Sequence, residues 1–244
     1  ADYAGTDVSR LRFVGMGGSP APMATIEAWT SRGVPLVQGY GMTETSPGIT
    51  SLDTQDLLRK PGSIGKPVPY TDVRLVGPDG VDVAPGEVGE FWVRGPNVTP
   101  GYWNRPDAAA QAFHEGWLKT GDAGRQDAEG FYYIVDRVKD MYISGGENVY
   151  PAEVENVLYQ LPQVAEAAVV GVPHPRWGET GLAVVVRRPG STLEAAEVLA
   201  HCNTRLARFK VPGEVAFVDQ LPRTAAGKVL KRQLRERFAA AAPA

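Results

Sequence analysis

Short apolar runs, separated by glycines and prolines, recur along the chain. Apolar runs at 11–16 and 34–37 flank a stretch that reads as a helix to about Ser31, which predicts a strand, loop, helix, strand unit. Gly17, Gly18 and Ser19 follow the first run, where glycine would let a ligand approach the backbone closely. For the glycine pair alone, a tight turn is the better interpretation.

Residues 63–101 are β-like: DVRLV (72–76) precedes a Gly-Pro-Asp-Gly turn at 77–80, and VGEFWVRGP (88–96) alternates apolar and polar positions. This pattern predicts a β-barrel or sandwich. We therefore expect the first part of the chain to combine an α/β piece with a β-barrel-like subdomain.

The sequence pattern changes at 136–151 (DRVKDMYISGGENVYP), where a charged cluster is followed by an apolar run, a glycine pair and a proline. Turn-rich segments precede this stretch, and short strands and helices in a βαβ-like order follow it, which is typical of a domain boundary. We expect domains at 1–136 and 137–244. The charged cluster alone would indicate a solvated turn.

Beyond the boundary the pattern predicts a small α+β domain. A helix should begin at Pro151 and end before Pro162, and a later helix should bury Cys202 on its apolar face. The last predicted element of this domain is a basic helix with apolar residues at four-residue spacing. The predicted strands lie at 164–172, 182–186 and 214–218.

Composition narrows the function classes. The 244 residues are 43% hydrophobic and 22% charged with a net charge of -3, so no basic excess attracts nucleic acid. No apolar run approaches the roughly 20 residues of a transmembrane helix. A single cysteine, Cys202, fits a reducing, cytoplasmic location and a packing role. The three histidines show no metal-ligand spacing.

Two stretches carry groups suited to a nucleotide. In QGYGMTETSP (38–47), Tyr40 stands between glycines and Thr43 precedes Glu44, which offers a stacking face, a phosphate donor and a metal ligand. In Thr120-Gly121-Asp122 the carboxylate could accept both hydroxyls of a ribose. An Asx turn is the default interpretation of the second stretch alone.

Two further stretches suit other ligands. Gly145 and Gly146, after Ser144, would let another backbone or a slender ligand approach. The segment PRTAAGK (222–228) presents Lys228 from a loop of small residues, which suits a catalytic cation that must arrive and leave. The basic residues after Lys228 are typical of a solvated helix face.

These motifs, in this order, resemble the adenylate-forming superfamily, which includes acyl-CoA synthetases, luciferase and peptide-synthetase adenylation domains. QGYGMTETSPG is similar to its YGxTE motif. The resemblance implies that Tyr40, with Gly41 beside it, stacks on adenine, that Thr43 contacts phosphate, and that Glu44 helps to hold Mg²⁺. It also implies that Asp122 binds the ribose with help from Arg137. By the same match, Gly17, Gly18 and Ser19 lie beside the adenine and acyl group.

The second half of the chain resembles the family's mobile carboxyl-terminal domain. The resemblance implies that Lys228 bridges the substrate carboxylate and the α-phosphate, and that the domain turns about Lys139. It implies that Gly145 and Gly146 line a pantetheine tunnel. Trp177 would lie near the nucleotide end of CoA, although a packing tryptophan is an equal alternative. The segment GEVGEFWVRGPNVTPGYWNRP matches mainly as structure, and we expect its Tyr102 and Trp103 to be buried aromatics without a role.

The family implies an AMP-forming acyl-CoA synthetase that uses ATP, Mg²⁺ and CoA on a fatty or aryl acid. The family's phosphate loop is absent from these 244 residues. We therefore expect the chain to be the carboxyl-terminal part of a larger enzyme and to be inactive in adenylation by itself. Two alternatives remain open: a domain that loads a carrier protein, and a non-catalytic nucleotide-binding fragment.

Overall fold

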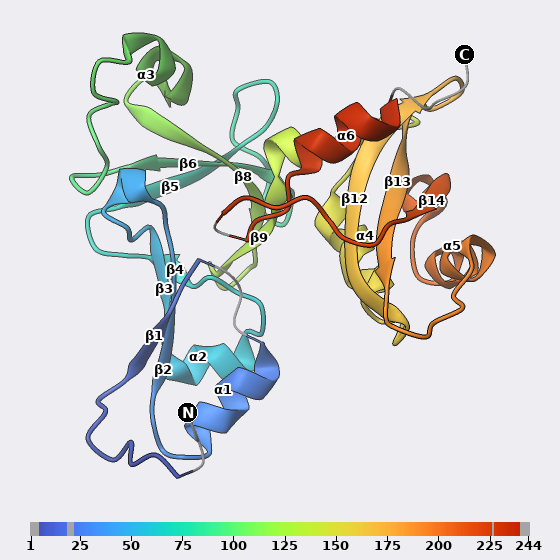
Figure 1. The fold of residues 1–244 in the computed structure, drawn as a ribbon. Coiled ribbons are helices and arrows are strands. Elements are labelled where there is room, and N and C mark those ends of the chain that lie inside the picture. Colours follow the sequence, from blue (N-terminus) through green and yellow to red (C-terminus); the bar gives the residue numbers. More distant parts are fainter. Residues whose placement is uncertain (1–4, 19–21, 226, 240–244) are drawn as a thin grey trace. The chain divides into compact units, whose positions relative to one another are not determined.

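The protein's structure is a computed structural model that describes residues 5–18, 22–225 and 227–239 (Figure 1). The chain divides into two compact units, Ala1–Ile134 and Val135–Ala244. The division falls close to the boundary that the sequence predicts after Asp136. None of the described helices is long and apolar enough to cross a bilayer.

The first unit begins with the predicted strand, helix, strand arrangement. Strand β1 (Val14–Met16) pairs in parallel with β2 (Leu36–Tyr40), and helix α1 (Met23–Thr30) connects them. The first strand is shorter than the apolar run suggested, because Leu11 and Phe13 are exposed. Two antiparallel strands complete this sheet: β3 (Thr50–Leu52) and β4 (Lys66–Pro67). Helix α2 (Thr54–Arg59) connects them.

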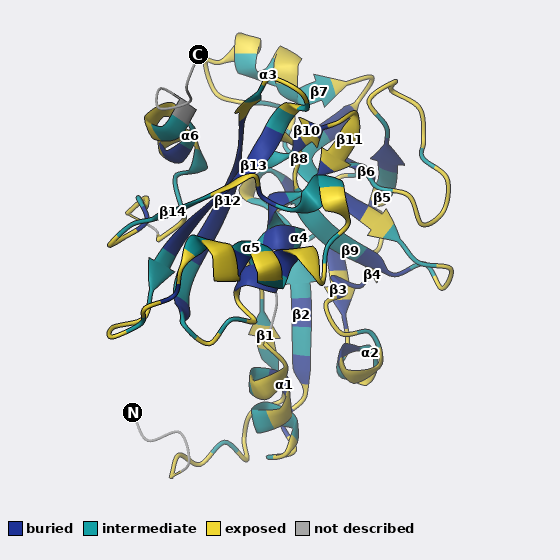
Figure 2. Ribbon diagram, turned by 90° about the vertical axis from the view of Figure 1, so that its right-hand side faces the viewer, coloured by how far each residue is buried: buried dark blue, intermediate teal, exposed yellow. Residues whose placement is uncertain are grey.

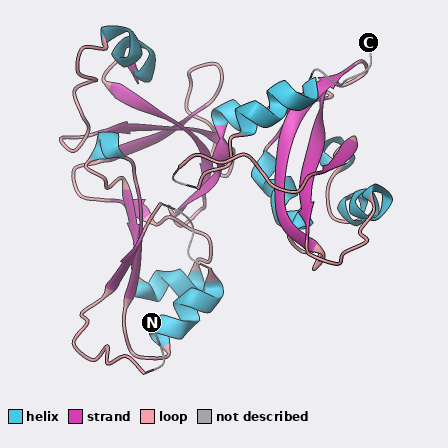
Figure 3. Ribbon diagram, viewed as in Figure 1, coloured by secondary structure: helices cyan, strands magenta, loops and turns pink. Residues whose placement is uncertain are grey.

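The second sheet of this unit is antiparallel and contains the β-rich part that the sequence predicts (Figure 3). Its order is β5-β6-β8-β7, and β9 pairs with β8. Phe91 is fully buried in its core, between Tyr40 and Tyr132. The elements are β5 (Asp72–Val76), β6 (Gly89–Arg94), α3 (Pro106–Ala112), β7 (Phe113–His114), β8 (Trp117–Gln126) and β9 (Tyr132–Arg137).

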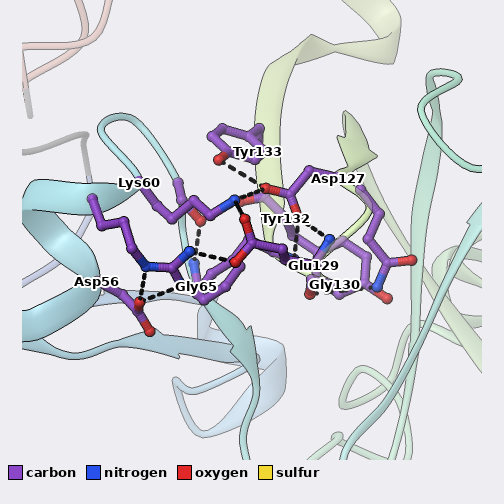
Figure 4. Close-up of polar contacts among 12 residues, drawn as sticks. Asp56, Lys60, Gly65, Asp127, Glu129, Gly130, Tyr132 and Tyr133 are labelled. Atoms are coloured by element: carbon purple, nitrogen blue, oxygen red, sulfur yellow. Dashed lines mark hydrogen bonds and ion pairs between the residues drawn. The ribbon is translucent and has the colours of Figure 1, made fainter.

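A network of ion pairs joins the end of α2 to the turn between β8 and β9 (Figure 4). Lys60 Nζ lies 2.7 Å from Asp127 Oδ2 and 2.5 Å from Glu129 Oε1. Burial alone raises the pKa of Asp127, but hydrogen bonds from Lys60 and from the backbone N–H groups of Phe131 and Glu129 lower this pKa well below its usual range. The network therefore fastens the two sheets of the first unit together.

The second unit is a sheet covered by helices on both faces. Its order is β11-β10-β13-β12, with β14 parallel to β13. The central hairpin of β12 (Val164–His174) and β13 (Gly178–Arg187) is longer than predicted and is mostly buried (Figure 2). The remaining strands are β10 (Tyr142–Ser144), β11 (Glu147–Val149) and β14 (Glu214–Phe217).

Alternate residues of the central hairpin enter two separate cores. Val169 packs in the core that contains Cys202, whereas the next residue, Val170, packs in the core that contains Leu234. Cys202 is fully buried, which confirms its predicted packing role, and this burial raises the pKa of its thiol. The helices are α4 (Pro151–Leu158), α5 (Ala195–Asn203) and α6 (Lys231–Ala239), and short 3-10 turns lie at Thr43–Thr45, Val138–Asp140 and Arg208–Lys210.

Candidate functional site

In the first unit, two of the predicted site residues meet. Tyr40 is the last residue of β2, and Asp122 lies in β8 of the other sheet. The Tyr40 hydroxyl donates a hydrogen bond to Asp122 Oδ2 at 2.7 Å across 82 positions of sequence. Thr120 Oγ1 accepts the Asp122 N–H at 3.1 Å and donates to the carbonyl of Phe91, so Asp122 lies in an ordered strand.

The loop after β2 requires glycine at position 41. A Cβ on Gly41 would lie 1.3 Å from the carbonyl oxygen of Pro47, because the loop folds back on itself. The buried Thr45 holds this fold through hydrogen bonds of its hydroxyl to the Met42 N–H and the Pro47 carbonyl. The loop thereby presents Thr43, which is exposed, and Glu44, which is half-buried.

Glu44 has a partner that the sequence did not predict. The hydroxyl of Tyr102 donates to Glu44 Oε1 at 2.9 Å. Tyr102 is 38% exposed and Trp103 is 91% exposed, so the expectation that both are buried aromatics is wrong. The loop 95–101 carries them to the surface, and no local sequence signal indicates the contact with Glu44, since 58 positions separate the two residues.

Glu44 fits a magnesium ion that arrives with a nucleotide. Among the residues that the structure describes, no group of three histidine, cysteine, aspartate or glutamate side chains could hold a metal. Mg²⁺ is commonly bound by one or two carboxylates together with water and substrate phosphates. A single half-buried carboxylate therefore suits Mg²⁺ only if water and the phosphates of a substrate supply the other ligands.

The predicted glycine loop follows β1. Gly17 packs beside β2, where an added Cβ would lie 3.3 Å from the Gly39 carbonyl oxygen, and Gly18 has φ +79°. The structure thus places Gly17 next to the residue that precedes Tyr40. Ser19 lies outside the described residues.

In the second unit, Lys228 lies on a short hydrogen-bonded turn. The Lys228 carbonyl accepts the Thr224 N–H at 2.8 Å, and the Lys228 N–H donates to Thr224 Oγ1 at 3.1 Å. Arg223 anchors the turn to β12 through an ion pair with Glu166 at 2.6 Å. The lysine side chain is exposed.

The three residues assigned to CoA lie together. Gly145 and Gly146 form the turn between β10 and β11, with φ of +62° and +90°. The Gly145 N–H donates to the Trp177 carbonyl at 2.9 Å, and a Cβ on Gly145 would lie 2.5 Å from Trp177 Cε3. The glycine therefore accommodates the half-buried indole, and at Gly146 nothing lies within 4 Å of an added Cβ.

The charged cluster at the start of the second unit is more than a solvated turn. Asp136 Oδ2 accepts the N–H of Ala152 in the first turn of α4 at 2.7 Å. Arg235 of α6 pairs with Asp140 at 2.7 Å and donates to the Lys139 carbonyl at 3.1 Å. The side chains of Lys139 and Arg137 are exposed. The segment around Lys139 is therefore tied to α4 and α6 of its own unit.

Comparison with known proteins identifies the family. The model of the AMP-binding enzyme matches residues 1–103, and that of the AMP-binding enzyme carboxyl-terminal domain matches residues 153–228. Feruloyl-CoA synthase of Amycolatopsis sp is 52% identical over 236 residues, which are 97% of this chain and 48% of that protein. A long-chain-fatty-acid–CoA ligase of Mycobacterium tuberculosis is 45% identical over 242 residues, 99% of this chain and 48% of the ligase.

A solved structure agrees with these matches. The o-succinylbenzoate CoA synthetase of Bacillus subtilis, in complex with its acyl-adenylate intermediate, superimposes with a TM-score of 0.83 at 44% identity. The match covers 92% of this chain and 46% of that enzyme. This chain spans about half the length of the curated relatives it matches. It belongs to the adenylate-forming superfamily of AMP-binding enzymes and resembles the carboxyl-terminal part of its acyl-CoA synthetases.

Proposed function

We propose that the protein joins a carboxylic acid to AMP at the expense of ATP and then transfers the acyl group to CoA. The hydrogen bond between Tyr40 and Asp122 is the observation that carries this proposal. It places an aromatic face beside a carboxylate, and these are groups suited to the adenine and the ribose of a nucleotide. Arg137 would assist Asp122, and the Gly17–Gly18 turn would lie beside the adenine and acyl group.

The first half-reaction replaces a poor leaving group with a good one. A carboxylate oxygen attacks the α-phosphorus of ATP, and the bond to pyrophosphate breaks. Thr43 would contact phosphate, and Lys228 would stabilise the negative charge that carboxylate and phosphate share in the transition state. A magnesium ion held by Glu44 and the phosphates would neutralise phosphate charge.

The second half-reaction forms the thioester. The sulfur of CoA attacks the acyl carbon, AMP leaves, and the thiol loses its proton. Gly145 and Gly146 would line the path of the pantetheine arm, and Trp177 would lie toward the nucleotide end of CoA. Because the two half-reactions require different groups, we propose that the second unit turns about Lys139 between them.

The names of the relatives support a substrate class. One acts, by its name, on ferulate and another on long-chain fatty acids, which supports an aryl or fatty acid here. The names of both relatives favour CoA as the acceptor over a carrier protein. The net charge of -3 gives no basic excess for a nucleic-acid partner, and we propose the cytoplasm as the location.

The test is carboxylate-dependent pyrophosphate exchange by the protein at its natural full length, followed by thioester formation with CoA or with an apo carrier protein. We expect exchange with an aryl or fatty acid and transfer to CoA. Asp122→Asn should raise the KM for ATP at least tenfold, since a hydrogen bond to a charged group contributes roughly 1.5–3 kcal/mol. Nucleotide binding without exchange for any acid would instead indicate a non-catalytic protein. The 244 residues alone, which lack the phosphate-loop motif, should not catalyse exchange.

A further inference from the structure

The segment 95–102, between β6 and α3, contacts the 42–48 loop through four hydrogen bonds from three residues. Asn97 Nδ2 donates to the carbonyls of Thr45 at 3.2 Å and Gly48 at 2.6 Å. The Thr99 N–H donates to the carbonyl of Glu44 at 2.8 Å. These three hydrogen bonds hold the backbone of the loop. The fourth, from Tyr102, reaches a side chain instead.

The Tyr102 hydroxyl has the properties of a dedicated donor to Glu44. A tyrosine hydroxyl, with an ordinary pKa of about 10, carries its proton at neutral pH and can donate a hydrogen bond. An ionised carboxylate only accepts hydrogen bonds. The phenol therefore occupies Oε1 and favours one orientation of the carboxylate, in which Oε2 can meet another partner.

We propose that Tyr102 is a positioning residue that orients Glu44 toward the divalent cation of a bound nucleotide. The inference rests on the proposed function, in which Glu44 meets Mg²⁺ together with the phosphates. Asn97 and Thr99 already hold the backbone of the 42–48 loop. The contact between Tyr102 and the carboxylate of Glu44 is therefore not needed to keep the loop folded. A carboxylate held in one orientation also loses less side-chain freedom when the cation binds.

The experiment measures ATP affinity by calorimetry, with Mg²⁺ and with EDTA, on the protein at its natural full length and without a carboxylic acid. The readout is the Kd for ATP in EDTA divided by the Kd for ATP with Mg²⁺. This ratio isolates the contribution of the cation to ATP binding. Tyr102→Phe should reduce this ratio about tenfold, as expected for one hydrogen bond to a charged group, and should leave the Kd in EDTA unchanged.

Tyr70→Phe is the matched control, because it removes the same hydroxyl from a tyrosine that is 88% exposed. This variant should leave the ratio unchanged. Tyr102→Phe keeps the ring of a residue that is already 38% exposed, so its melting temperature should stay close to that of the unmodified protein. Weaker ATP binding by Tyr102→Phe to the same extent with and without Mg²⁺ would show a general structural role and would overturn the proposal.

Glu44→Gln separates this inference from the proposed function. If both hold, Glu44→Gln lowers the ratio, and adding Tyr102→Phe to it causes no further loss. A lower ratio in Glu44→Gln but an unchanged ratio in Tyr102→Phe overturns the role of Tyr102 alone. An unchanged ratio in Glu44→Gln overturns the role assigned to Glu44, and the role of Tyr102 with it.

Discussion

Gly145 occupies a position that the indole of Trp177 leaves open only to glycine. An added Cβ would lie 2.5 Å from Trp177 Cε3 and 2.8 Å from Cζ3, and the φ of +62° disfavours any side chain there. The two residues belong to neighbouring segments, because Ser144 of β10 pairs with Gly178 of β13. The glycine turn and the tryptophan therefore form one surface of the second unit.

Gly145→Ala should displace the indole and impair the thioester step. A left-handed conformation costs a non-glycine residue about 1–3 kcal/mol, and the clash with Trp177 adds to this. We expect a lower melting temperature and a higher KM for CoA when acyl adenylate is supplied ready-made. Adenylation, measured by pyrophosphate exchange, should change little.

Gly146→Ala is the matched control, since its φ of +90° imposes similar strain but nothing lies within 4 Å of the added Cβ. It should destabilise the protein less than Gly145→Ala. If the clash is the cause, Trp177→Ala in the Gly145→Ala background should recover part of the lost melting temperature. Equal effects of the two alanine variants on the KM for CoA would contradict the role given to the indole.

Lys228→Ala should slow adenylation a hundredfold or more, because removal of one electrostatic donor from a transition state typically costs roughly 3 kcal/mol. The side chain is exposed and the turn that carries it is held by backbone contacts of Thr224, so stability should not change. Arg232→Ala serves as the control, since this neighbouring cation is 81% exposed and pairs only with Glu236 among the ion pairs of the described chain. Thioester formation from preformed acyl adenylate should survive in both variants, and its equal loss in Lys228→Ala would refute the assignment.

Lys139→Pro should separate the two half-reactions. Proline fixes φ near about -65° and disfavours the helical conformation of the preceding residue, Val138, which lies in the same 3-10 turn. If the second unit turns on the torsions of Lys139, the proline variant should keep most of its adenylation and lose most of its thioester formation. Adenylation should survive because substrate binding leads first to the arrangement of the two units that carries out this half-reaction.

Lys139→Ala keeps the backbone free and should support both half-reactions. A thermal melt of each variant detects general misfolding, which would lower both rates together. Thioester formation at the unmodified rate by Lys139→Pro, from preformed acyl adenylate, would place the hinge elsewhere.

Asp127→Asn should destabilise the first unit by about 1–3 kcal/mol at neutral pH, because it breaks a network of charged hydrogen bonds. The folded-state pKa of Asp127 is depressed, so the folded state binds fewer protons than the unfolded chain. Its stabilisation is present above the unfolded pKa of about 3.9 and is lost as pH falls below that value. The difference in melting temperature between the variant and the unmodified protein should therefore shrink from pH 7 to pH 3.

The exposed pair of Asp72 and Arg94 provides the comparison, with side chains 64% and 53% exposed. Asp72→Asn should change stability little at any of these pH values, since exposed ion pairs contribute about 0–1 kcal/mol. A melting difference for Asp127→Asn that is constant from pH 7 to pH 3 would show that the ionised carboxylate is not what the network stabilises.

The sequence by itself determined the local features of this protein. Side-chain periodicity predicted β12, β13 and the burial of Cys202, because side chains follow the fixed repeat of a strand or helix. The motifs around Tyr40, Asp122 and Lys228 identified the family, since each motif is contiguous in sequence. The exact ends of the strands were not predictable: the apolar run 11–16 indicated a longer strand, but β1 begins at Val14, and Leu11 and Phe13 are exposed.

Only the tertiary structure decided which of these residues meet. Tyr40 reaches Asp122 across 82 positions, and Tyr102 reaches Glu44 across 58, because the pairing of β5, β6 and β8 and the packing of the two sheets set these distances. The register between strands is a global property: a shift of one residue would turn Asp122 to the opposite face of its sheet. For the same reason Tyr102 was predicted from the sequence to be a buried aromatic without a role, whereas in the fold its hydroxyl donates to the carboxylate of Glu44.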